Sequence, residues 1–330
     1  MNTVEDVVKR EGFFKKFLKN DLSRTFVILV VLCLIMGIAR PQTFLTFNNL
    51  INMISQISVN GIMVMGLFFA ILTGGINISI GSVAAFTSLI TAMMLVSKNP
   101  FTSNMAVALA AGIGISVVVG IIAGFFIAEL GLQPYIVTLA LQVMFRGLTM
   151  VVSQGIPVSK LGNAFSYIGV KYLGPIPINV IIMMALFAIF YYVLEHTCFG
   201  RHLYAIGGNK EAARLSGINT KKDIYKVYII GSLMAAVAGM ILASRVNSAT
   251  PTAGQGAEMD AIAAAVIGGA SLKGGKGTIL GALIGAVIIG VLNNGLVLLD
   301  IDVYWTQAVK GAIILIAVSA DAISWKKSEK

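Results

Sequence analysis

Long apolar runs alternate with short polar segments along the whole 330-residue chain. A helix that spans a membrane needs about 20 mostly apolar residues. Ten candidate runs meet or approach this length: residues 24–40, 48–73, 77–97, 104–129, 134–153, 177–196, 223–246, 259–273, 278–299 and 303–323. The ten-residue alternating pattern that is typical of a transmembrane barrel does not occur. The pattern predicts an all-α membrane protein with about ten transmembrane helices.

The eighth run is the weakest candidate. Its core, "MDAIAAAVIGGASL", is interrupted by glycine and as a helix would extend only about 21 Å. It could therefore be re-entrant. Ten crossings that start inside place most of the 24 basic residues on the cytoplasmic side, as the positive-inside rule requires. We therefore expect ten spans with both termini cytoplasmic.

This topology predicts a single transmembrane domain, residues 24–325, with a large cytoplasmic loop at 197–222. Residues 1–23 precede it as a cytoplasmic or interfacial segment, and residues 326–330 form a cytoplasmic tail. Within the first segment, "GFFKKFLKN" is either a short helix in the inner membrane interface or a solvated basic tail. The next apolar run resembles a signal peptide, but it leads directly into a multi-span chain, which favours a retained first helix.

The composition agrees with a membrane protein and argues against other classes. Hydrophobic residues make up 57% of the chain, charged residues 12%, and the mean hydropathy is +0.90. A soluble core could not hide this much apolar surface, so lipid must be the solvent. The net charge of +10 does not indicate nucleic-acid binding, because the basic residues cluster between apolar runs.

Few residues could carry catalytic or metal chemistry. Cys33 and Cys198 provide neither a disulfide framework nor a metal cluster. His196 and His202 fall at or beyond the inner end of the sixth run, where an interfacial position is expected. We therefore expect no metal and no enzyme activity.

A glycine-rich segment, "GGASLKGGKGT", invites comparison with a phosphate-binding loop. With Lys276 as the loop lysine, the template G-x-x-x-x-G-K-[ST] needs glycine and a hydroxyl residue where this chain has Ala270 and Gly277. The segment also follows an apolar helix and not a strand. We expect a tight cytoplasmic turn, and no ATP or other cofactor bound by this chain.

Two apolar runs carry polar stripes at helical spacing. The second run has Asn49, Asn52, Gln56 and Asn60, and the fifth has Thr138, Gln142, Arg146, Thr149 and Ser153. Facing lipid would be costly, by about 3 kcal/mol for the arginine alone. The stripes either join helices through hydrogen bonds or line a path for a polar, uncharged solute. We favour a path that comprises Asn52, Gln56, Asn60, Gln142, Arg146 and Asn293.

Two glycine-rich turns separate neighbouring runs. The first, "LTGGINISIGS", and the second, "VIGGASLKGG", match weakly at an offset of 194 residues, which suggests but does not establish a duplication. Glycine permits tight turns and broken helices of the kind found at transporter binding sites. The predicted hinge residues are Gly74, Gly75, Asn77, Gly81, Gly268, Gly269, Gly274 and Gly275.

The cytoplasmic loop contains a charged island, "GGNKEAARLSGI". Asn209 is a good helix N-cap, and Gly217 is a natural stop. These signals predict a two-turn helix over Lys210–Ser216. Its small apolar face, with Ala212, Leu215 and the stem of Arg214, suits docking into a partner, although an ordinary solvated loop is equally compatible with the pattern.

The pattern E-A-A-x-x-x-G at Glu211–Gly217 resembles the cytoplasmic loop with which ABC importer permeases engage their ATPase. "TGGINISIGS", "FRGLTMVVSQGIPVS" and the long block Pro251–Ala286 narrow the match, over about residues 40–320, to the ribose-type carbohydrate importer permeases. The resemblance implies the ABC importer permease fold in a bacterial inner membrane and assigns the coupling role to one segment: Asn209, Glu211, Ala212, Ala213, Arg214, Leu215 and Gly217.

The resemblance also implies partners. These are a second permease copy, an extracytoplasmic sugar-binding protein, and a cytoplasmic ABC ATPase that would bind ATP and Mg. One position departs from the family, whose first turn usually reads G-G-I-D-L-S. Asn77 takes the place of the acid, so any role that requires a carboxylate there is in doubt.

We therefore expect the permease subunit of an ATP-driven importer for ribose or a similar pentose or hexose. The alternatives are an ion-coupled secondary sugar transporter and a passive channel. Ion-coupled transporters tend to keep ionisable groups at mid-membrane depth. Here Arg146 is the main deep charge, with no acid expected beside it, and Glu258 and Asp260 are expected near the outer mouth.

Overall fold

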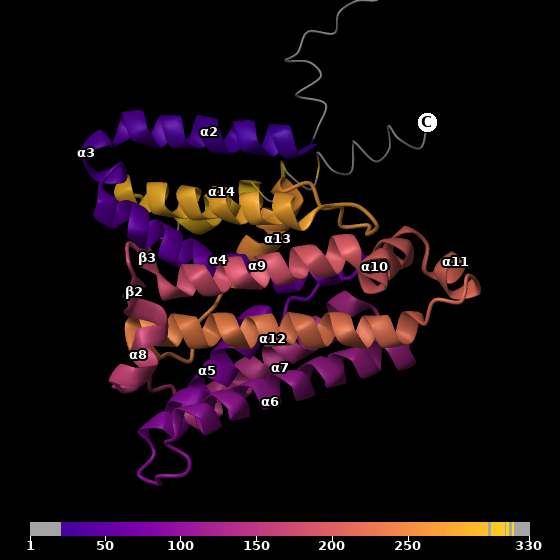
Figure 1. Cartoon of the computed structure of the whole chain (residues 1–330), viewed down its shortest axis with the longest axis horizontal. Coiled ribbons are helices and arrows are strands. Elements are labelled where there is room, and N and C mark those ends of the chain that lie inside the picture. Colours follow the sequence, from indigo (N-terminus) through magenta and orange to yellow (C-terminus); the bar gives the residue numbers. More distant parts are fainter. Residues whose placement is uncertain (1–20, 303–304, 314, 317–318, 320–330) are drawn as a thin grey trace, which may run out of the picture.

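The computed structural model describes residues 21–302, 305–313, 315–316 and 319 of the chain, and this part is almost entirely helical (Figure 1). The first helices are α2 (Asp21–Ala39), α3 (Pro41–Phe44), α4 (Phe47–Leu72), α5 (Ile80–Val96), α6 (Met105–Gly124), the π-helical turn η1 (Phe125–Glu129) and α7 (Pro134–Ser153). The remaining ones are α8 (Asn163–Val170), α9 (Ile178–His196), α10 (Cys198–Gly208), α11 (Lys210–Leu215), α12 (Thr220–Val246), α13 (Ala257–Ile267) and α14 (Ile279–Leu298). The prediction of an all-α membrane protein is confirmed.

Within the described residues, seven helices are long and apolar enough to cross a membrane: α2, α4, α6 with η1, α7, α9, α12 and α14. The predicted third span is the shorter apolar helix α5, which has 17 residues. The eighth is α13, whose 11 residues extend about 16 Å, roughly half the hydrocarbon thickness of a bilayer. Re-entry therefore accounts for α13 better than a full crossing, and the total of ten crossings stays a prediction.

Several predictions fall on residues outside the described part. These are the interfacial segment 1–20 with "GFFKKFLKN", parts of the tenth run 303–323, and the tail 326–330. Of the tenth run, residues 305–313 are described and helical. The cytoplasmic position of both termini stays a prediction.

The core lies around α12, which packs against α4, α5 and α6. In Figure 1 the long helices run roughly parallel, with α2 on one outer side and α6 on the other. Close approach of α12 depends on small residues: a Cβ on Gly120 of α6 would come within 2.5 Å of the Ile229 Cα. Lipid tails are as apolar as leucine, so close contact between backbones, and not apolar burial, holds membrane helices together.

Two short antiparallel ladders lie in the connections between helices. β1 (Val158–Ser159) pairs with β4 (Ser248–Ala249), and β2 (Tyr172–Leu173) pairs with β3 (Ile176–Pro177). The first ladder joins the connection after α7 to the connection after α12. It therefore fixes one end of the segment that leads from α12 to α13.

Candidate functional site

The coupling segment α11 is held by the capping residues that the sequence indicates. The Asn209 side-chain oxygen Oδ1 accepts hydrogen bonds from the backbone N–H groups of Glu211 and Ala212, at 3.0 and 2.9 Å. At the other end Gly217 has φ +87, a left-handed conformation that glycine adopts at little cost. The helix is present and is one residue shorter than predicted, because Ser216 already serves as its C-cap.

The exposed side of α11 has both charge and apolar surface. Leu215 is 78% exposed, and Ala212 is exposed beside it, whereas Ala213 is buried against the protein. Glu211 and Arg214 form an ion pair on the exposed side, and the Arg214 guanidinium lowers the pKa of Glu211 by hydrogen bonding. The predicted face of Ala212, Leu215 and Arg214 is thus free for a partner, and α11 projects at one end of the molecule (Figure 1).

The helix α10 connects α11 to the body of the protein through two side-chain contacts. His202 Nδ1 lies 2.9 Å from Asp223 Oδ2 at the start of α12. The Tyr204 hydroxyl donates to the backbone carbonyl of Gly277 over 2.9 Å. Burial, together with the nearby Glu195, raises the pKa of Tyr204 to about 12, so the phenol stays protonated and able to donate. A displacement of α11 would therefore act on both α12 and the turn before α14.

Both glycine-rich turns meet the start of the coupling segment. We call Gly74, Gly207, Gly208, Gly274 and Gly275 the glycine junction. The Gly275 N–H donates to the Leu72 carbonyl at the end of α4, over 2.9 Å. A Cβ on Gly207 would overlap that carbonyl and the Gly275 nitrogen, whereas a Cβ on Gly208 would meet nothing within 4 Å. Three chain segments that are far apart in sequence therefore touch through their backbones.

The other predicted hinge residues lie outside the junction. A Cβ on Gly75 would lie 2.6 Å from the Tyr228 hydroxyl oxygen, and one on Gly268 would overlap the Gly281 carbonyl. Gly269 has φ +89, which fits a turn. Gly81 packs against Gly254, in the connection between β4 and α13. These glycines serve close packing at several separate places.

Asn77 is buried in the extended segment between α4 and α5. Its side-chain oxygen accepts from the Ser79 N–H and the Ser79 hydroxyl, at 3.2 and 2.8 Å. The amide therefore performs the local capping that an acid would perform at this position, without burying a charge.

The two polar stripes have different surroundings. On α7, the Gln142 amide donates to Glu258 Oε1 over 3.0 Å, and Arg146 Nη1 donates to the carbonyls of Pro251 and Ala253 at 2.8 and 2.9 Å. This stripe holds the connection between β4 and α13. The expectation that no acid accompanies Arg146 is wrong. The connection places Glu258 against Gln142, near the middle of α7.

The stripe on α4 divides along its length. Asn49 near the outer end exchanges hydrogen bonds with Asn294 of α14, at 3.1 and 2.8 Å, which is the helix-joining role. Further along, Gln56 and Asn60 line a cavity of about 370 Å³ together with Asn293. Asn52 is exposed on the same helix and does not line this cavity. Three of the six predicted path residues are thus brought together.

The same cavity contains charged residues that sequence patterns did not place there. Lys310 Nζ donates to Asp260 Oδ2 over 2.9 Å, and the side chains are only 24% and 11% exposed. Asn293 donates to the same oxygen over 3.2 Å. In the sequence, the feature that could have indicated this pair is that Asp260 and Lys310 are charged residues within apolar runs.

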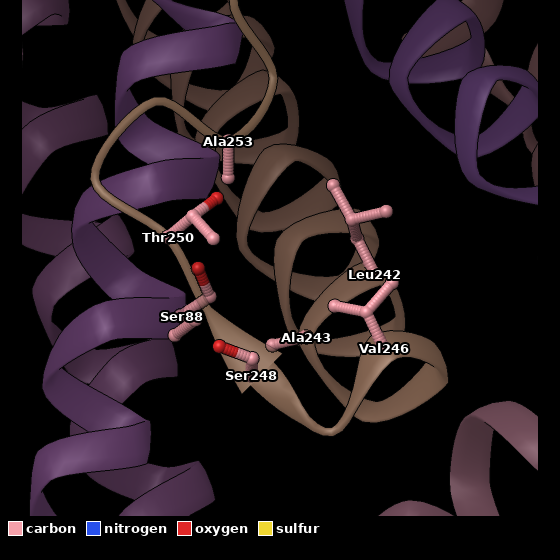
Figure 2. A pocket seen from close by; sticks show the side chains of 8 residues that line it. Ser88, Leu242, Ala243, Val246, Ser248, Thr250 and Ala253 are labelled. Atoms are coloured by element: carbon pink, nitrogen blue, oxygen red, sulfur yellow. The ribbon is translucent and has the colours of Figure 1, made fainter. Parts of the chain in front are cut away.

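A second cavity, of about 300 Å³, lies between α5, the end of α12 and the segment after β4. Figure 2 shows the side chains of Ser88, Ser248 and Thr250 on one side and those of Leu242 and Val246 on the other. Its lining is mainly apolar, and none of the predicted path residues lies in it. Within the described residues, no group of three or more His, Cys, Asp or Glu side chains could hold a metal ion.

Comparisons with known proteins match almost the whole chain. The family model described as "Branched-chain amino acid transport system / permease component" matches residues 49–318. Ribose import permease protein RbsC of Escherichia coli (strain K12) is 42% identical over 323 residues, which cover 97% of this chain and 98% of that protein.

Other relatives have similar coverage. Ribose import permease protein RbsC of Bacillus subtilis (strain 168) is 44% identical over 90% of this chain and 91% of its own. D-allose transport system permease protein AlsC of Escherichia coli (strain K12) is 38% identical over 92% of each chain. No solved structure matches. The chain belongs to the permease component family that matches residues 49–318, and within it to the ribose-type ABC importer permeases.

Proposed function

We propose that this protein is the permease subunit of an ATP-driven importer that moves ribose, or a similar pentose or hexose, across the bacterial inner membrane. The observation that carries this proposal is the near full-length similarity to permeases named for ribose import, in a chain with seven apolar helices long enough to span a membrane. The relatives named for allose and xylose transport support a sugar as the substrate class.

The proposal includes three partners. A cytoplasmic ATPase binds ATP and Mg and docks on α11, and an extracytoplasmic sugar-binding protein delivers the substrate. A second copy of this chain completes the pore. Support for a separate ATPase comes from the family and from the sequence "GGASLKGGKGT", which lacks two residues of a phosphate-binding loop.

In the proposed coupling mechanism, ATP-driven closure of the ATPase displaces α11. The Tyr204–Gly277 hydrogen bond and the glycine junction carry this displacement to the end of α4 and to the turn between α13 and α14. Asn60 lies on α4 and Asp260 lies on α13, and both residues line the larger cavity. Close-packed backbones transmit a displacement because they cannot be compressed.

Reconstitution tests this function. The chain would be placed in proteoliposomes with its ATPase and sugar-binding protein, and uptake of labelled D-ribose, D-allose and D-xylose would be measured. We expect uptake of at least one sugar that requires ATP hydrolysis and stops when the ATPase is inactivated. Uptake by the permease alone that an uncoupler abolishes would instead establish the ion-coupled alternative, which none of the named relatives supports.

A further inference from the structure

The larger cavity is lined by elements that are distant in sequence. α4 contributes Gln56 and Asn60, α14 contributes Asn293, and the helical residues 305–313 contribute Lys310. Asp260, in the first turn of α13, also lines the cavity. Clefts of roughly 300–1,000 Å³ with a few convergent polar groups are typical of small-molecule sites, and about 370 Å³ falls within that range.

Three charged side chains line the cavity: Arg245, Asp260 and Lys310. The Lys310 ammonium and the Asn293 amide both donate to Oδ2 of Asp260, at 2.9 and 3.2 Å. Both bonds use Oδ2, and the other oxygen of the Asp260 carboxylate, Oδ1, can accept from another donor. Asp260 and Lys310 are paired with each other, and Arg245 of α12 adds a second cation to the lining.

One buried acceptor in the cavity lacks a donor. The side-chain oxygen Oδ1 of Asn293 is inaccessible to solvent and has no hydrogen-bond partner among the described residues, although the amide nitrogen of the same side chain is bonded to Asp260. Buried acceptors without a donor are uncommon in native proteins. The Asn293 side chain lies beside the carboxylate of Asp260, which also accepts hydrogen bonds.

The polar groups of α7 do not contribute to this cavity. Gln142 and Arg146 are occupied by Glu258 and by two backbone carbonyls. The polar groups that face this cavity are those of α4, α12, α13, α14, the connection between β4 and α13, and residues 305–313.

We propose that this cavity is a binding site for one monosaccharide within the permease itself. A sugar hydroxyl donates to Asp260, and sugar oxygens accept from Lys310 and from the amides of Gln56 and Asn60. This inference rests on the proposed function and adds the residues that recognise the solute.

Protection of substituted cysteines tests the site. Cys33 and Cys198 would be replaced by serine, and Asn293→Cys would be introduced into the full chain in complex with its ATPase. The rate of modification by a small thiol reagent would be measured while D-ribose is added. We expect saturable protection, about threefold at twice the half-saturating concentration, as single-site occupancy requires.

Asn294→Cys is the matched control. Asn294 is the adjacent residue on the same helix, but its side chain pairs with Asn49 and does not line the cavity. D-ribose should leave its modification rate unchanged. Gln56→Cys provides a second cavity position if Asn293→Cys fails to fold, and it should be protected at the same D-ribose concentrations.

Two results would overturn the proposal: no saturable protection at either cavity position, or equal protection at Asn293→Cys and Asn294→Cys, which would indicate a general conformational response. Uptake by the unmodified transporter separates this failure from failure of the proposed function. Uptake of D-ribose without protection removes the cavity site alone. Absence of ATP-driven uptake of D-ribose, D-allose and D-xylose removes the proposed function.

Discussion

At the scale of single residues, side-chain oxygens and guanidinium groups determine where irregular backbone can lie. Asn209 begins α11 because one oxygen satisfies two N–H groups that a helix start leaves without partners. Arg146 satisfies two carbonyls of a connection that dips between helices. In a membrane protein such backbone groups have no water to bind, so each polar side chain stabilises a specific path of the chain.

Asn209→Ala removes the cap of α11. We expect a cost of about 1 kcal/mol to this helix, the usual value for a lost N-cap. Sugar-dependent ATP hydrolysis and uptake should fall, while the amount of protein in the membrane stays the same. Asn209→Asp, which keeps an acceptor oxygen, is the control and should retain both activities. Unchanged coupling in Asn209→Ala would show that α11 need not be preformed.

Arg146→Met removes the donor and keeps much of the side-chain volume. Two carbonyls then lose a charged donor, and we expect the free energy of unfolding to fall by about 2–4 kcal/mol. Thermal unfolding in detergent, followed by size-exclusion chromatography, measures the change. Arg146→Lys restores an ammonium donor and should lie between the two. Equal stability and uptake for Met and Arg would mean that the connection does not depend on this contact.

At the scale of elements, the glycine junction joins the end of α4, the end of α10 and the turn before α14. Sequence comparison aligned the two glycine turns only weakly, at an offset of 194 residues. The structure places them in backbone contact, with Gly207 between them. Glycine is required there because any side chain would separate the segments, which no local pattern at Gly207 indicates.

Gly207→Ala and Gly208→Ala form a matched pair on one helix. The Gly207 change forces a methyl group into the Leu72 carbonyl, so we expect a lower unfolding temperature and loss of ATP-driven uptake. The Gly208 change meets open space and should be neutral or slightly stabilising, by up to about 1 kcal/mol. Similar behaviour of the two variants would argue that the junction is loosely packed.

At the scale of the whole molecule, the arrangement of spans determines which residues each partner can reach. In the proposed topology the predicted coupling loop faces the ATPase, and the connection between α5 and α6 faces the opposite side. Leu215 and Phe101 are both large, apolar and strongly exposed, and they mark these two positions. Their placement on opposite sides of the membrane follows from the proposed topology.

Single cysteines at these positions test the topology. In a chain without Cys33 and Cys198, Phe101→Cys should react with a membrane-impermeant reagent applied from outside, once the outer membrane or wall is opened. Leu215→Cys should react only after the inner membrane is disrupted. If both cysteines reacted from the same side, the number of crossings between them would be even, and the predicted odd number would be wrong.

Stoichiometry is the second property of the whole molecule. Native mass spectrometry of the complex with its ATPase should detect two copies of this chain. A single copy would contradict the proposed homodimer, and a complex that contains a second, different permease chain would replace it with a heterodimer.

The sequence by itself determined the membrane class, the boundaries of most long helices, the cap and stop of α11, and the family. These follow from short-range rules: apolar length, helical spacing and local hydrogen bonds act within about one or two helical turns. The polar stripes were also correctly seen as groups that must avoid lipid, as their hydrogen bonds across helices illustrate.

Only the tertiary structure decided what each stripe faces. Gln142 and Arg146 hold a connection, Asn49 joins two helices, and Gln56 and Asn60 line a cavity with the Asp260–Lys310 pair. It also showed that α13 is too short to cross alone and that Glu258 lies deep in the protein. The physical reason is that a polar side chain can satisfy its hydrogen bonds with any nearby partner, and which partner is near depends on contacts between segments over 100 residues apart.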